Sequence, residues 1–100
     1  MSINLVAICD NDKVAKELEQ TCEKLGYTIN CEIQGAGGIV DKLTDEQLDK
    51  AIAILIVTQK EFEQIEDKER FKKRNYYQVV PLFVMQNAKD IIEEILYDSK

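Results

Sequence analysis

One cysteine stands where this chain could carry out phosphoryl chemistry. Cys9 follows an apolar run, residues 3–8, and a helical pattern starts within a few residues after it. In parallel α/β domains, such a position lies at the carboxyl end of a strand and below a helix N-terminus, where anions and reactive groups gather. A helix N-terminus also favours the thiolate form, which is the nucleophile. We therefore take Cys9 as the candidate catalytic residue.

The segment after Cys9 is the candidate phosphate loop, and it is acidic. A carboxylate about 4 Å from a phosphoryl oxygen costs about 4 kcal/mol per unit charge pair at an effective dielectric of 20. A charge-assisted contact from a lysine recovers about 1.5–3 kcal/mol. No glycine follows until Gly26, although glycine is what usually lets backbone N–H groups turn inward around an anion. The loop residues are Asp10, Asn11, Asp12 and Lys13.

Other reaction classes find less support. The chain has no histidine, which removes Ser-His and Cys-His pairs and most zinc sites. Asp10, Asp12 and Glu17 form an alternative magnesium site, but aspartates before a helix are more often caps, so we predict neither metal nor cofactor. A response-regulator-like receiver would need an aspartate where the third predicted strand ends, at 57–60, and the residues there are Val-Thr-Gln-Lys.

Length and composition predict one globular domain, residues 1–100. Apolar residues make up 45% and charged residues 32%, and the net charge of −6 argues against nucleic acid as a partner. The chain shows no signal peptide, and its longest apolar run, 51–57, is too short to span a bilayer. We therefore expect a cytoplasmic protein with no membrane insertion. Cys22 and Cys31 lie on apolar faces and read as reduced core residues.

A basic cluster interrupts the acidic composition. Its functional interpretation is a docking patch for an acidic partner protein, and its structural interpretation is a solvated turn. The cluster consists of Lys68, Arg70, Lys72, Lys73 and Arg74.

The hydrophobic pattern alternates between strand and helix four times. It predicts an α/β fold with a four-stranded parallel sheet flanked by helices on both faces, a Rossmann-like three-layer sandwich. Polar residues alternate along the second strand and predict one solvent-exposed face, and the glycine-rich stretch 34–38 predicts a turn. The predicted strands are 3–8, 27–33, 51–58 and 76–80, and the predicted helices start near Asn11 or Asp12, at Thr44, near Phe62 and at Asn87.

Several segments together resemble a known family. The stretch 32–39, E-I-Q-G-A-G-G-I, resembles E-x-Q-G-x-x-G-I, and 43–48, L-T-D-E-Q-L, resembles L-T-x-x-x-I at the matching separation. The helix ending in Leu25-Gly26 and the segment Glu69-Arg70-Phe71 also match in order. This pattern resembles the fructose-family IIB components of the bacterial phosphoenolpyruvate-dependent sugar phosphotransferase system (PTS).

The resemblance implies a phosphocysteine relay. In that family a cysteine after the first strand, in C-P-T-G-x-A-H-T, takes a phosphoryl group from the IIA component and passes it to a sugar bound in the membrane IIC component. Cys9 takes that cysteine's place, although its loop is about five residues shorter and lacks the rest of the motif. Two functions stay open: a IIB phosphocarrier with IIA and IIC as partners, and a degenerate IIB-like domain that acts through protein interaction or regulation.

Overall fold

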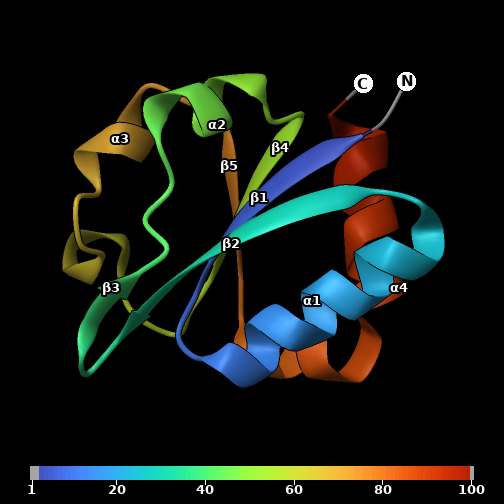
Figure 1. Ribbon diagram of the computed structural model, residues 1–100, viewed down its shortest axis with the longest axis horizontal. Helices are drawn as coiled ribbons and strands as arrows, with labels where there is room; N and C mark the ends of the chain where they lie inside the picture. Colours follow the sequence, from blue (N-terminus) through green and yellow to red (C-terminus); the bar gives the residue numbers. More distant parts are fainter. Residues whose placement is uncertain (1–2, 100) are drawn as a thin grey trace.

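The computed structural model describes residues 3–99 of the 100-residue chain as an α/β sandwich (Figure 1). Strands and helices alternate along the sequence as the hydrophobic pattern predicts. In chain order the elements are β1 (Asn4–Cys9), α1 (Asp12–Leu25), β2 (Thr28–Gly35), β3 (Gly38–Val40), α2 (Asp45–Lys50), β4 (Ala53–Val57), the 3₁₀ turn η1 (Phe62–Gln64), α3 (Glu69–Lys72), β5 (Tyr76–Val79) and α4 (Pro81–Asp98).

The sheet has the order β3-β2-β1-β4-β5. Its four main strands, β2, β1, β4 and β5, are parallel, as predicted. The chain goes from β1 outward to β2 and then crosses back to β4 on the other side of β1. From β4 the chain crosses outward again, to β5. The crossovers that leave the neighbouring strands β1 and β4 therefore run in opposite directions, and open α/β sheets bind ligands at the carboxyl ends of such a pair of strands.

Helices cover both faces of the sheet, so the core has two halves. On one face, α1 and α4 pack against alternate residues of β1 and β4, including Leu5, Ala7 and Leu55. On the other face, α2, η1 and α3 cover Val6 and Ile8. Figure 1 shows α1 and α4 together on one side, and α2 and α3 on the other. The three-layer prediction is confirmed.

One strand was not expected. The sheet is mixed rather than purely parallel, because β3 pairs antiparallel with the last residues of β2, Ile33 to Gly35. The glycine-rich stretch, predicted as a flexible turn, is a tight hairpin in which Gly35 pairs with Gly38. Gly38 has φ of 103°, a conformation that glycine adopts without strain. A three-residue strand is too short to produce a recognisable alternating pattern.

The last helix also differs from the prediction, which placed its start at Asn87. Helix α4 starts at Pro81, because the fixed φ of proline suits the first helical position. Asn87 then interrupts the helix with φ of −159° and ψ of 56°. Its side chain donates to the Asp90 carboxylate at 2.8 Å. The polar signal at Asn87 thus marks a break inside a helix rather than its beginning.

Helix α1, which follows the candidate cysteine, is specified locally at both ends. The Asn11 side chain caps its N-terminus, with Oδ1 accepting from the Val14 backbone N–H at 3.1 Å. Gly26 ends it in the left-handed conformation, with φ of 79°. The buried residues Val14, Leu18 and Cys22 form the predicted apolar stripe. Helix α1 thus covers one face of the sheet at the end of β1.

Candidate functional site

The candidate site lies where β1, β2 and β4 end at the carboxyl edge of the sheet. Cys9 is the last residue of β1 and pairs in register with Val57, the last residue of β4. The end of β2 is close on the other side, since a Cβ added to Gly35 would lie 3.5 Å from the Asp10 carbonyl oxygen. Cys9 therefore lies at the carboxyl end of β1, where the hydrophobic pattern predicted a strand to end.

The Cys9 side chain points into the core rather than out of the sheet edge. Alternate residues of β1 face opposite sides, and Cys9 shares the α1 side with Leu5 and Ala7. Val14 and Leu18 of α1 belong to the same cluster. Only 1% of Cys9 is exposed to solvent. The thiol is thus covered by the helix whose N-terminus would have to serve an incoming phosphoryl group.

The other two cysteines gather around the same core. Cys31 lies on the same face of the neighbouring strand, and Cys22 is buried on the facing side of α1. Interaction with the Cys31 sulfur, and then burial, raise the pKa of the Cys9 thiol far above its ordinary range. Burial also raises the pKa of Cys22, to about 11. All three are free thiols, and both shifts disfavour the thiolate that nucleophilic attack requires.

The four residues of the candidate loop do not surround the Cys9 sulfur. Asn11 is the N-cap of α1 and Asp12 is its first residue, where the carboxylate interacts favourably with the helix dipole. The side chains of Asp12 and Lys13 are exposed, whereas Asp10 is half-buried. The alternative magnesium site is not formed, because no group of three potential ligands comes together within residues 3–99.

A buried charge network beside the site was missed by the sequence analysis. Glu32 is fully buried, and its carboxylate accepts a bidentate pair from Arg70: Nη1 to Oε1 at 2.7 Å and Nη2 to Oε2 at 3.0 Å. The Leu43 backbone N–H donates to Oε1 at 2.8 Å, and Gln34 Nε2 donates to Oε2 at 2.7 Å. Gln34 also exchanges two hydrogen bonds, each of 3.0 Å, with the backbone of Glu66.

This network, which we call the Glu32 clamp, holds three distant segments together. The segments are β2, the chain after β3, and the stretch from Glu66 to α3. Burial raises the pKa of Glu32, but the hydrogen bonds from Arg70, Gln34 and Leu43 outweigh it, so the net pKa is below its ordinary value. The only sign of this network in the sequence was the presence of Glu32 and Gln34 at the end of the second predicted strand. The predicted exposed face of β2 is exposed at Thr28 and Asn30 but buried at these two residues.

The basic cluster is largely neutralised by its own surroundings. Arg70 belongs to the clamp, and the other paired cations form surface salt bridges. A cluster whose charges are already paired attracts an acidic partner only weakly. The surface pairs are Lys68–Glu63, Lys72–Glu69 and Arg74–Asp49.

Because the pKa values of the buried thiols are raised, we expect the protein to lose stability at alkaline pH. A folded-state pKa above the unfolded value leaves stability intact below the unfolded pKa and removes it as pH rises toward the folded pKa. For Cys22 this window runs from 9.0 to about 11. We expect the free energy of unfolding to fall there by about 1.4 kcal/mol per pH unit for each titrating thiol.

Urea unfolding from pH 7 to 10.5, in a non-thiol reductant, measures this loss. The variant Cys9→Ala/Cys22→Ala should show a flatter dependence on pH than the parent chain. An equally steep decline of the unfolding free energy in both proteins would show that the two thiols do not cause the loss of stability.

Comparison with known proteins identifies the family to which this sequence is similar. Residues 13–94 match the family described as "PTS system, Lactose/Cellobiose specific IIB subunit". The match begins after Cys9 and covers most of the chain. The fructose-like EIIB component 1 of Escherichia coli K12 is 33% identical over 95% of this chain and 92% of its own length. The fructose-specific EIIABC component of Bacillus subtilis is 30% identical over 82% of this chain and 12% of its own length.

Solved structures show the same fold. The Enzyme IIB subunit of the PTS from E. coli K12 superposes with a TM-score of 0.84 at 32% identity, over 95% of this chain and 92% of that one. A domain of the fructose-specific IIABC component of Borrelia burgdorferi gives a TM-score of 0.83 at 27% identity, over 97% and 96%. Among residues 3–99, none of the helices has the length and apolar character to cross a membrane. The family match, the relatives and the shared fold together show that this chain belongs to the PTS IIB family and is similar to its fructose-like members.

Proposed function

We propose that this chain is a IIB-type domain that binds other PTS components without carrying a phosphoryl group on Cys9. The burial of the Cys9 sulfur below α1 is the observation that carries the proposal. A nucleophile that must meet a phosphoryl donor on another protein has to reach the surface. Exposing this one would require α1 to lift from the sheet, which would expose a large part of the core on that face.

The electrostatics of the site support the same conclusion. The pKa of Cys9 is raised by Cys31 and by burial, so at neutral pH the thiol stays protonated. The segment that follows supplies a cap at Asn11 and an exposed acidic residue at Asp12, and no glycine before Gly26. These features favour the degenerate IIB-like alternative over the phosphocarrier that the resemblance first implies.

The partners proposed for this domain are IIA and IIC components. Relatives carry IIB fused to them, as the names EIIBC and EIIABC state. A IIB-type domain that keeps the fold but not the reaction can occupy the surface of such a component and regulate it. We place this role in the cytoplasm, and we assign no sugar, because the family description names lactose and cellobiose whereas the relatives are fructose-like.

A phosphoryl-transfer assay tests the proposal. The chain is incubated with labelled phosphoenolpyruvate, the general PTS proteins and a IIA domain, with the fructose-like EIIB component 1 of E. coli as the positive control. We expect label on the control and none on this chain. Label on the parent chain that is lost in Cys9→Ala would overturn the proposal and restore the phosphocarrier, whose supporting observation is the position of Cys9 at the end of β1.

A binding measurement completes the test. Titration calorimetry with the IIA domain, and with a detergent-solubilised IIBC protein in which the IIB cysteine is substituted, should detect association with this chain. Cys9→Ala should bind each protein equally well. Absence of binding to both would refute the interaction role.

A further inference from the structure

Part of the outer edge of β2 is unpaired, and two adjoining hollows border it. Within residues 3–99, β3 pairs only with Ile33 to Gly35, and no strand pairs with the outer side of residues 28–32. Asp41 has φ of 56°, and at that residue the chain turns away instead of continuing β3 along β2. Unpaired strand edges readily accept another strand.

The backbone groups on this edge can be assigned. The Thr28 N–H donates inward, to the Ile3 carbonyl at 2.9 Å. Because successive residues of a strand direct their N–H and C=O groups to opposite sides, Ile29 and Cys31 direct theirs outward. The next outward residue, Ile33, is the one that pairs with Val40 of β3, which agrees with the assignment. The free edge thus offers four hydrogen-bonding groups in line with β3, namely the N–H and C=O groups of Ile29 and Cys31.

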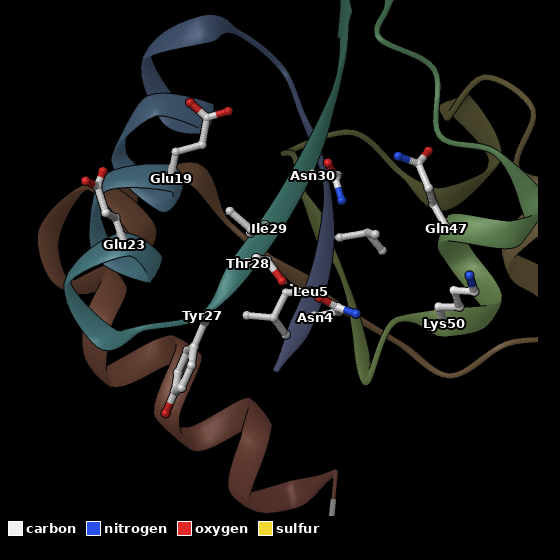
Figure 2. Close-up of a pocket in the computed structure, with 11 residues that line it drawn as sticks. Asn4, Leu5, Glu19, Glu23, Tyr27, Thr28, Ile29, Asn30, Gln47 and Lys50 are labelled. Carbon is white, nitrogen blue, oxygen red and sulfur yellow. Dashed lines mark hydrogen bonds between the residues drawn. The ribbon is translucent and has the colours of Figure 1, made fainter. Parts of the chain in front are cut away.

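A continuous groove runs along these groups. One hollow of about 520 Å³ is lined by Thr28, Ile29 and Asn30, and a second of about 360 Å³ adjoins it toward Asp41. The two hollows share Glu19, Ile29, Asn30 and Gln47 as lining residues. Figure 2 shows β2 between two walls, with α1 on one side and α2 on the other.

The walls of the groove differ in charge. Glu19 and Glu23 of α1 are exposed and line one side, whereas Gln47 and Lys50 of α2 line the other (Figure 2). Residues four apart on a helix are separated by about 6 Å along its axis. Alternate side chains of a strand are separated by about 6.7 Å. An added strand can therefore place successive cationic side chains, on its α1 side, opposite Glu19 and Glu23.

A second copy of this chain fits the groove poorly. An antiparallel β2–β2 pair related by a twofold axis keeps the same faces of the two sheets together, so α1 would lie beside α1 of the other copy. Glu19 and Glu23 of both copies would then face one another, in a chain whose net charge is already −6. Like charges in such positions oppose pairing.

From these observations we propose that the free edge of β2 binds an extended, basic segment of a partner protein by strand addition. The segment pairs antiparallel to β2, in line with β3, with Lys or Arg at alternate positions toward α1 and small polar residues toward α2. The inference rests on the proposed role as a protein-binding domain and names the surface. It does not depend on Cys9, so a phosphoryl label on Cys9 and a failure of strand addition would be separate results.

Nuclear magnetic resonance tests this proposal with a capped peptide of about eight residues that alternates lysine and threonine. We expect shift changes centred on residues 28–32 and slower hydrogen exchange at the Ile29 and Cys31 amides. A peptide with glutamate in place of lysine should not bind. Shift changes centred elsewhere, or no binding at millimolar peptide, would overturn the proposal.

Two matched variants separate backbone pairing from side-chain effects. Ile29→Pro removes an outward N–H and no bond to β1, whereas Ile29→Ala removes the side chain and keeps the N–H. We expect Ile29→Pro to bind the peptide about tenfold more weakly than Ile29→Ala. Equal affinity would contradict strand addition. If Ile29→Pro does not fold, the exchange rates of the parent amides decide the question.

Charge and self-association are tested in the same way. Glu19→Lys/Glu23→Lys should weaken peptide binding at least about fivefold, whereas Glu94→Lys, an exposed change on α4, should leave it unchanged. Analytical ultracentrifugation should show a monomer. A dimer that Ile29→Pro abolishes would assign the edge to a second copy and refute the peptide proposal.

Discussion

Arg70→Met should cost this protein about 3–5 kcal/mol of unfolding free energy, because the change leaves the Glu32 carboxylate buried without its counter-charge. Arg70 supplies both bonds of the bidentate pair, and its side chain is only 8% exposed. The remaining donors to Glu32, from Leu43 and Gln34, are neutral and cannot balance the charge. Equilibrium unfolding in urea measures the loss.

Two further proteins make this result specific. Arg74→Met removes a salt bridge to Asp49, whose side chain is 66% exposed, and a hydrogen bond to the Arg70 carbonyl, and it should cost only about 1–2 kcal/mol. Glu32→Gln/Arg70→Met removes the buried charge together with its partner and keeps an oxygen for Leu43, so it should be more stable than Arg70→Met alone. If Arg70→Met is as stable as Arg74→Met, the clamp is not a significant source of stability.

Phe71→Ala should be comparably damaging, with an expected loss of about 3–5 kcal/mol. Phe71 is fully buried in the half-core below α2 and α3, and it is the apolar residue that anchors the four-residue helix α3 in that core. A helix that short has little stability of its own, so its position depends on this anchor. For a domain of this size the melting temperature should fall by more than about 12 °C, as calorimetry would record.

The chain offers a matched control for this substitution. Phe83 lies on α4 and is 56% exposed, so Phe83→Ala should change the unfolding free energy by no more than about 0.5 kcal/mol. Similar losses for the two variants would mean that burial does not determine the effect.

The strands and main helices were predictable because their signals are local. A buried parallel strand is an apolar run, and α1 carries a regular stripe with a polar cap before it and Gly26 after it. The position of Cys9 at the end of β1 follows from the same pattern. The hairpin of β2 and β3 was not predictable in this way, because a three-residue strand leaves no periodic signal.

The sequence does not predict the direction of the Cys9 side chain or the Glu32 clamp; both become visible only in the three-dimensional structure. Both faces of β1 are covered, so Val6 and Ile8 are as apolar as Leu5 and Ala7, and the sequence cannot tell which set faces α1. Glu32 and Arg70 are 38 residues apart, and charged residues in an alternating strand ordinarily indicate solvent. Only the three-dimensional arrangement shows that one of these polar positions is buried.

The long separation in sequence between Glu32 and Arg70 also bears on how the domain unfolds in part. Local opening in proteins proceeds through cooperative units smaller than the whole domain. The stretch from Thr58 to Arg74 contains no strand. It is joined to the rest of the domain by the clamp, by the buried side chains of Ile65 and Phe71, and by the stacking of Phe62 on Tyr76. We therefore expect this stretch to open as one cooperative unit, while the parallel sheet and the helix over Cys9 stay folded.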